Sequence, residues 1–136
     1  MLAGDPQSQH HIFYEDAHSV TFLNKYPTLY GYSLVCPKAH LTEVTGDFLL
    51  EGYLRLQSVV YRVAEALRQE LGAERVYILS LGSQQGNSHV HWHVAPLPPG
   101  VPYEKQQFHA LMAENGILQI PDEEMKDLAS RLRKRL

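Results

Sequence analysis

Three of the eight histidines of this chain lie at alternate positions in one short run, as His89, His91 and His93. Val90 and Trp92 separate them. Side chains of an extended strand alternate between its two faces, so the three imidazoles should share one face while the apolar residues between them pack into a core. An imidazole titrates near neutral pH and can act as a nucleophile, a hydrogen-bond donor or a proton donor. The spacing therefore predicts a reactive row of histidines.

A zinc site is a second interpretation of the same row, because histidine is a common zinc ligand. On an extended strand, residues four apart have Cα atoms about 13 Å apart, whereas ligand nitrogens lie about 2 Å from zinc. Two of the rings could share an ion, but a third ligand would have to come from elsewhere in the chain. A solvent-facing polar row on an edge strand is the remaining interpretation.

The loop before the row, residues 82–88, has the composition of an anion-binding turn. Its two glycines allow the backbone to curl, so that N–H groups can point at a phosphate. Gln85, Asn87 and Ser88 add neutral side-chain donors. We expect this loop to hold a phosphate over the histidines.

The elements that must position the row can be predicted from periodicity. Apolar side chains recur every three or four residues over 47–71, as in an amphipathic helix, and Gly72 suits its C-terminal end. Alternation and turn residues predict strands at 11–15, 19–24, 32–36, 75–81 and 89–95. Helical segments are predicted at 103–114 and from 121 onward. This order predicts an α+β fold with a mostly antiparallel sheet.

Composition and charge narrow the classes of function. With 136 residues, 44% of them hydrophobic, the chain can bury the core of one domain. The formal net charge of −3 gives no general electrostatic case for binding long nucleic acid. Residues 1–10 lack the apolar core of a signal peptide and no run approaches a membrane span, so we expect a cytoplasmic protein without a membrane partner. Cys36 follows apolar residues and is expected to be a buried structural thiol.

The histidine row and two other segments resemble the histidine triad (HIT) superfamily of nucleotide hydrolases and transferases. Residues 89–94, His-Val-His-Trp-His-Val, fit its signature of alternating histidines. Residues 31–40 are similar to its Gly-His-x-Leu-Val-x-Pro-Lys-x-His segment, and residues 22–27 resemble its nucleoside-pocket strand. The resemblance implies a five-stranded antiparallel sheet with one long helix. It also implies three regions, namely a flexible N-terminus at 1–9, a HIT-like domain at 10–100, and a helical C-terminal extension packed on that domain at 101–136.

The same resemblance implies a homodimer and a two-step reaction. His91 would attack the α-phosphorus and form a covalent nucleotidyl-imidazole, which water then hydrolyses. His89 would help to fix the tautomer of His91, and His93 would contact the phosphate and the departing group. Asn24 would bind ribose hydroxyls and Phe22 would border the base. The protein would bind no cofactor of its own, although Mg²⁺ can accompany a polyphosphate substrate.

Two positions depart from the pattern of the superfamily. Tyr32 stands where a histidine is usual, and a phenol donates a hydrogen bond but does not ordinarily change charge near pH 7. We expect Tyr32 to take the place of that histidine among the substrate-binding residues. The residues 86–88 abut the first histidine directly, a spacing closer to the transferase branch. His93 favours hydrolysis, because that branch carries glutamine there.

The predicted function is therefore hydrolysis of a phosphoanhydride or phosphoramide bond in a dinucleoside polyphosphate or a nucleoside phosphoramidate. A nucleotidyl transferase or phosphorylase is one alternative, in which another acceptor replaces water. A nucleotide-binding protein without turnover is the other alternative, and Tyr32 is the residue that favours it.

Overall fold

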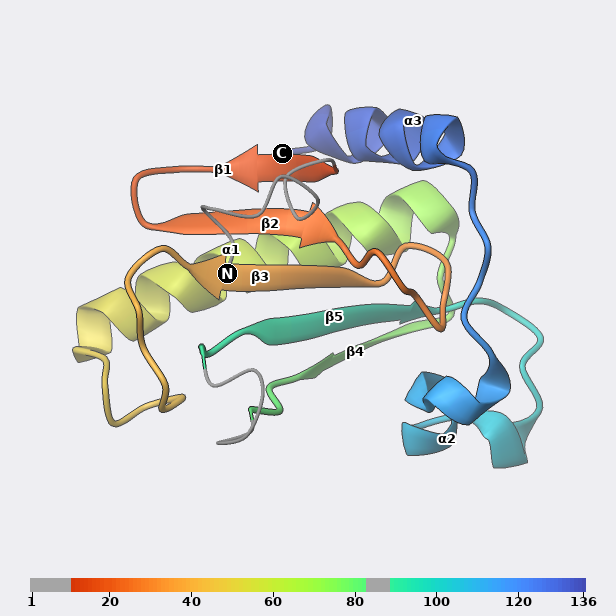
Figure 1. Cartoon of the computed structure of the whole chain (residues 1–136), viewed down its shortest axis with the longest axis horizontal. Coiled ribbons are helices and arrows are strands. Elements are labelled where there is room, and N and C mark those ends of the chain that lie inside the picture. Colours follow the sequence, from red (N-terminus) through yellow and green to blue (C-terminus); the bar gives the residue numbers. More distant parts are fainter. Residues whose placement is uncertain (1–10, 83–88) are drawn as a thin grey trace.

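A computed structural model describes residues 11–82 and 89–136 of the chain. One antiparallel sheet of five strands, in the order β1-β2-β3-β5-β4, forms its centre (Figure 1). The strands are β1 (Ile12–Glu15), β2 (Ser19–Leu23), β3 (Ser33–Pro37), β4 (Arg75–Leu79) and β5 (Trp92–Leu97). The helices are α1 (Leu50–Leu71), α2 (Phe108–Leu111) and α3 (Asp122–Arg133). The α+β fold with its antiparallel sheet is thus confirmed.

The β1–β2 hairpin is closed by the carboxylate of Asp16. Its Oδ1 accepts hydrogen bonds from the backbone N–H groups of His18 and Ser19, at 2.7 and 2.8 Å. A carboxylate that binds the backbone two and three residues ahead forms the turn by itself. The two strands on either side of this turn, predicted at 11–15 and 19–24, pair antiparallel as β1 and β2.

The long helix α1 begins three residues later than the predicted 47. The Oδ2 atom of Asp47 accepts hydrogen bonds from the backbone N–H groups of Thr42 and Glu43, so this residue belongs to the preceding turn. The helix ends at Gly72, whose positive φ of 62° lets its N–H reach the carbonyl of Arg68. None of the helices in the described ranges is long and apolar enough to cross a membrane.

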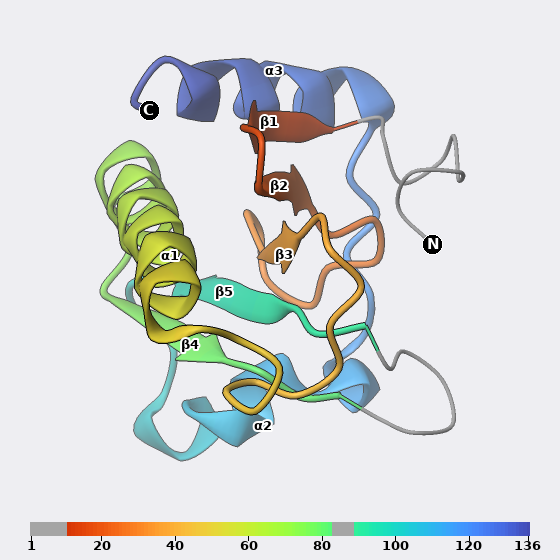
Figure 2. The same cartoon turned by 90° about the vertical axis from the view of Figure 1, so that its left-hand side faces the viewer.

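The two faces of the sheet differ in what covers them. The helix α1 lies across one face, and α3 lies beside β1 (Figure 2). The main hydrophobic core is formed between these helices and that face, and its members are Phe13, Leu23, Val35, Leu56, Val59, Val60, Val63, Ala64, Ala66, Leu67, Val90, Trp92, Val94, Met125, Leu128, Ala129 and Leu132. A smaller apolar cluster of Val20, Phe22 and Cys36, with Ile12 and Leu34 against it, is separate from that core.

The last strand starts and ends later than the predicted 89–95. It begins at Trp92 and continues through Pro96 to Leu97. The sequence interpretation ended the strand at the first proline, which was wrong. Pairing of β5 with β3 stops at Val94, so Pro96 has a strand neighbour only on the β4 side. Proline is tolerated in a strand that is paired on one side only.

The approach to β3 requires a glycine. Gly31 has φ +86°, and a Cβ atom placed on it would lie 2.5 Å from Cδ1 of Leu71 at the end of α1. A side chain at this position would meet both an unfavourable backbone conformation and a filled space. Close contact between the start of β3 and α1 therefore depends on Gly31.

The C-terminal region contains one long helix, α3, whereas the helical segment predicted at 103–114 is divided into short helices that include α2. Residues 103–114 form short turns, and a positive φ of 61° at Gln107 interrupts them. The helix α3 packs on β1 and α1. Arg131 of α3 and Arg135, two residues beyond the end of α3, both pair with Glu70 of α1. The C-terminal helix is therefore fastened to the sheet domain by apolar contacts and by ion pairs.

Candidate active site

The alternation predicted for the histidine row is present. Val90, Trp92 and Val94 are all buried in the main core. The indole of Trp92 packs edge-to-face against the rings of Phe48 and Tyr53, with centroids 6.0 and 6.3 Å away. These contacts fix the strand against α1, so the side chains between them must point to the other face of the sheet.

On that other face, His93 belongs to a row that crosses three strands. It lies opposite Leu34 of β3, and Leu34 in turn lies opposite Phe22 of β2. Residues directly opposite on neighbouring strands point to the same side of a sheet. Phe22 belongs to the small apolar cluster and is 7% exposed. The structure thus places an apolar patch beside an imidazole.

His91 is held as a single tautomer by the main chain. Its Nδ1 atom lies 2.9 Å from the carbonyl oxygen of His89. A carbonyl oxygen only accepts hydrogen bonds, so Nδ1 carries the proton and the neutral ring has its lone pair on Nε2. The residue is 5% exposed, and the carbonyl of His91 accepts a hydrogen bond of 2.7 Å from the Ser80 hydroxyl. Nε2 of His91 is therefore preorganised as a nucleophile.

The imidazole of His89 turns toward β3 and the segment after it. Its Nε2 lies 2.9 Å from the carbonyl oxygen of Pro37, and its Nδ1 lies 3.2 Å from Nδ1 of His40. The carbonyl requires the proton on Nε2 of His89, so His40 donates in the second contact when both rings are neutral. The group of His89 that contacts His91 is its carbonyl. The sequence did not predict that His40 contacts the histidine row, because no local spacing pattern relates His40 to His89.

His93 contacts both His91 and Tyr32. Its ring centroid lies 4.7 Å from that of His91, and its Nδ1 atom lies 2.8 Å from the phenol oxygen of Tyr32. Burial, with a further contribution from His91, lowers the pKa of His93 to about 4, although a hydrogen bond with the Leu81 backbone acts in the opposite direction. Burial raises the pKa of Tyr32. At neutral pH both side chains are therefore uncharged.

Asn24 lies one residue beyond β2 and next to Tyr32. Its backbone N–H donates to the Tyr32 carbonyl at 2.8 Å, and its Oδ1 accepts from the N–H of Tyr26 at 3.0 Å. The side-chain oxygen thus closes a turn, and the amide NH₂ is the part of the side chain that can donate to a ligand. The predicted loop residues Gln85, Asn87 and Ser88 lie outside the described residues.

The described part of the chain offers no group of three or more His, Cys, Asp or Glu side chains that could hold a metal ion. Cys36 is 1% exposed, and burial raises the pKa of its thiol to about 12. A thiol in this state is a poor nucleophile. Cys36 is the structural residue that the sequence predicted.

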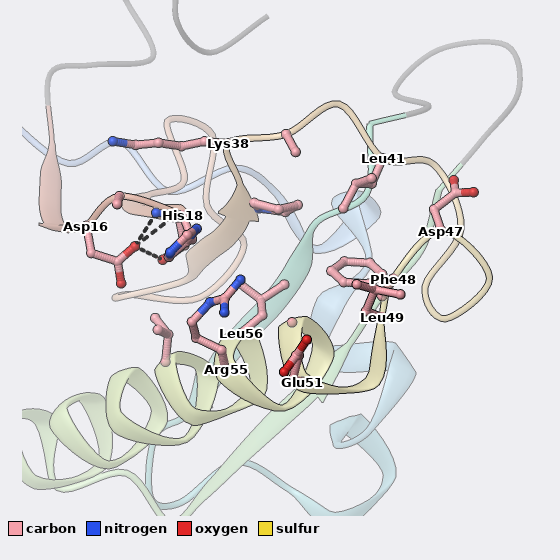
Figure 3. Close-up of a pocket in the computed structure, with 16 residues that line it drawn as sticks. Asp16, His18, Lys38, Leu41, Asp47, Phe48, Leu49, Glu51, Arg55 and Leu56 are labelled. Carbon is pink, nitrogen blue, oxygen red and sulfur yellow. Dashed lines mark hydrogen bonds between the residues drawn. The ribbon is translucent and has the colours of Figure 1, made fainter.

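A cavity of about 330 Å³ lies between the start of α1 and the β1–β2 turn (Figure 3). Leu41, Phe48, Leu56 and Val59 form its apolar part. Its charged lining residues are of both signs, namely Lys38 and Arg55 against Asp16, Asp47 and Glu51. None of the predicted site residues within the described ranges lines this cavity, although Pro37, which the His89 ring contacts, does.

Known proteins share both the sequence pattern and the fold. A family model described as the HIT domain matches residues 5–99. The chain belongs to the HIT family. The expected resemblance and the HIT-like sheet are thereby confirmed. No curated protein gives a significant match to the chain.

Solved structures of other HIT proteins superpose on most of this chain. A histidine triad protein from Sinorhizobium meliloti has a TM-score of 0.76 at 20% identity, over 93% of this chain and 89% of its own. A zinc-bound histidine triad family protein from Mycobacterium smegmatis has a TM-score of 0.69 at 26% identity, over 90% and 84%. A Plasmodium falciparum diadenosine triphosphate hydrolase, in complex with Cyclomarin A, has a TM-score of 0.67 at 15% identity, over 93% and 76%.

Proposed function

We propose that this HIT protein hydrolyses a phosphoanhydride or phosphoramide bond in a nucleotide through a covalent intermediate on His91. The observation that carries the proposal is the hydrogen bond from Nδ1 of His91 to the carbonyl of His89, which leaves the lone pair on Nε2. A neutral imidazole is nucleophilic near pH 7 without prior deprotonation. We also propose that the protein acts in the cytoplasm on a small nucleotide, with no bound cofactor.

The reaction proceeds in two displacements. Nε2 of His91 forms a bond to the α-phosphorus, and the bond from phosphorus to the leaving group breaks, with its electron pair going to that group. The ring becomes cationic, and its Nδ1–H stays hydrogen-bonded to the carbonyl of His89, which stabilises the charge. Water then attacks phosphorus and loses a proton to the solvent, the P–N bond returns its electron pair to Nε2, and a nucleoside monophosphate leaves.

The surface around His91 suits a nucleotide. The apolar cluster that contains Phe22 lies on the same side of the sheet as His93 and offers a contact for a base. The NH₂ group of Asn24 is a donor for ribose hydroxyls. The solved diadenosine triphosphate hydrolase with this fold adds support for a dinucleoside polyphosphate substrate.

The products decide between the candidate reactions. Diadenosine triphosphate is incubated with the protein, with and without inorganic phosphate. Hydrolysis yields AMP and ADP in equal amounts under both conditions. Phosphorolysis yields ADP alone and requires phosphate. Tight binding without products would contradict both reactions and would favour a nucleotide-binding protein.

Asn24→Ala tests the nucleoside end of the site. We expect KM to rise about 5- to 30-fold while kcat changes little, because a lost neutral hydrogen bond corresponds to about 1–2 kcal/mol. The variant Asn24→Asp keeps an oxygen for the N–H of Tyr26 but removes the NH₂ donor. It should therefore raise KM as well while it preserves the turn. A loss of stability in Asn24→Ala with an unchanged KM would assign this residue to the turn alone.

The edge of the sheet at β4 allows the proposed homodimer to be tested. β4 has a strand neighbour on one side only, and Ile78 on it is 49% exposed. On α1, Leu54 and Tyr61 are also exposed apolar residues. Unpaired edges are usually covered, so we propose a symmetric homodimer. Light scattering should give twice 15.5 kDa at micromolar concentration, and Ile78→Lys should shift the protein toward monomer. A wild-type monomer would contradict the proposal.

A further inference from the structure

The hydroxyl group of Tyr32 forms a hydrogen bond with one ring nitrogen of His93. Phenol oxygen and Nδ1 lie 2.8 Å apart, and the two rings meet edge-to-face, with centroids 5.8 Å apart at 86°. Tyr32 is 7% exposed, and its hydroxyl contacts no other hydrogen-bonding group within residues 11–82 and 89–136. If Nδ1–H donated to the phenol, the phenol proton would have no acceptor among these residues. The phenol therefore donates, and the proton of the neutral imidazole is on Nε2.

The surroundings of His93 keep this imidazole neutral. The only titratable ring beside it on its own segment is His91, which opposes a second positive charge. It is faced by the uncharged Tyr32, one residue before β3, by Leu79 of β4, its pairing partner, and by the backbone of Leu81, which forms a hydrogen bond with the ring. Within the described ranges, no carboxylate contributes to the titration of His93. The site therefore has a neutral imidazole at position 93, where an imidazolium would present a transferable proton.

We propose that Tyr32 is a positioning residue that holds His93 as the neutral Nε2–H tautomer, and that the site consequently favours phosphoanhydrides over phosphoramidates. This inference rests on the hydrolysis proposed above. It adds the class of leaving group that this chain accepts.

The chemistry of the leaving groups explains the preference. When a phosphoanhydride is cleaved, the breaking P–O bond gives its electron pair to a phosphate oxygen, which is stable as an anion near neutral pH because the second pKa of a phosphate is about 6. Such a group can depart without receiving a proton from His93. An alkylamine must gain a proton as the P–N bond breaks, since the pKa of its ammonium form is about 10. A neutral imidazole does not supply that proton.

The position of the proton on the His93 ring can be measured by a method that does not depend on enzymatic activity. In ¹⁵N NMR spectra of the wild-type protein between pH 6 and 8, Nδ1 of His93 should appear as a pyridine-type acceptor and Nε2 as a pyrrole-type N–H. Tyr32→Phe removes the donor and should give a mixture of tautomers. Tyr53→Phe is the matched control, because this half-buried tyrosine packs on Trp92 in the core and should leave the His93 signals unchanged. A cationic His93, or Nδ1–H in the wild type, would overturn the positioning role.

The leaving-group preference is tested with diadenosine triphosphate and an adenosine 5′-phosphoramidate of an alkylamine. We expect kcat/KM to be about 100-fold or more higher for the anhydride, because general acid catalysis of amine departure is missing. Tyr32→Phe should lower kcat on the anhydride about 10-fold with little change in KM. Tyr32→His supplies a second imidazole and should reduce the preference for the anhydride over the phosphoramidate.

The pH dependence gives a further test. Because His93 stays neutral, kcat of the wild type on the anhydride should not fall between pH 6.5 and 8.

The possible failures are distinguishable. Equal or faster cleavage of the phosphoramidate by the wild type would overturn the leaving-group preference and leave the hydrolysis intact. Absence of turnover on both substrates would overturn the hydrolysis and the preference together. The NMR measurement would still decide whether Tyr32 sets the tautomer of His93.

Discussion

Replacing His91 with asparagine should lower kcat about 10⁴-fold or more and leave nucleotide affinity nearly unchanged, as expected for loss of a covalent nucleophile. The structure supports this expectation, because the variant removes the Nε2 lone pair that the hydrogen bond to the His89 carbonyl sets free. Single-turnover kinetics would measure the rate, and calorimetry would measure the affinity. His18→Asn is the matched control, since this exposed histidine lies in the β1–β2 turn and lines the separate cavity.

The covalent intermediate can be examined directly. After rapid acid-free quenching, the labelled nucleotide should be found on the peptide that contains His91, as a phosphoramidate that is labile in acid and stable in base. Substitutions at His89 and His93 should be less damaging than His91→Asn, because neither residue forms the bond. Wild-type turnover in His91→Asn would contradict the covalent mechanism. Activity lost with a chelator and restored by zinc would instead favour the metal interpretation of the row.

Gly31→Ala should destabilise the protein by about 2–5 kcal/mol. A positive φ costs a side chain about 1–2 kcal/mol, and forcing a methyl group into a filled space adds about 1–3 kcal/mol. The added Cβ would lie 2.5 Å from Cδ1 of Leu71. The shift of the urea midpoint at constant m would measure the change in the free energy of unfolding.

Gly72→Ala separates the two contributions. Gly72 also has a positive φ, but no atom lies within 4 Å of a Cβ placed on it. This variant should therefore show only the backbone cost, about 1–2 kcal/mol. If both variants were equally destabilised, Leu71 would have moved aside at no cost and the packing argument would fail.

Local patterns in the sequence were sufficient to predict the main architecture. The alternation of His89, His91 and His93 with buried apolar residues was predicted from period two alone, and the burial of Val90 and Trp92 confirms it. Strands that pair with near neighbours in the chain were likewise predicted, because turn residues such as Asp16 act through local hydrogen bonds.

Features that depend on distant contacts were not predictable in this way. The contact of His40 with His89 joins residues from opposite sides of α1 in the chain. The hydrogen bond from Tyr32 to His93 depends on the pairing of β3 with β5, which no local pattern specifies. Periodicity alone placed the start of α1 too early, because the Asp47 carboxylate binds backward to Thr42 and Glu43 and so belongs to the preceding turn. Residues 103–114 contain good helix formers, yet tertiary contacts divide them into short turns.

The position of His91 just outside β5 has a further consequence for thermal behaviour. The neighbouring His93 is paired with strands on both sides, whereas His91 is attached through the Ser80 hydroxyl and through the bond from the Val90 N–H to the Leu41 carbonyl. Segments held by a few hydrogen bonds open more readily than the centre of a sheet. Local opening at this point would release the nucleophile while the rest of the domain stays folded. We therefore expect activity to be lost on heating before the domain as a whole melts.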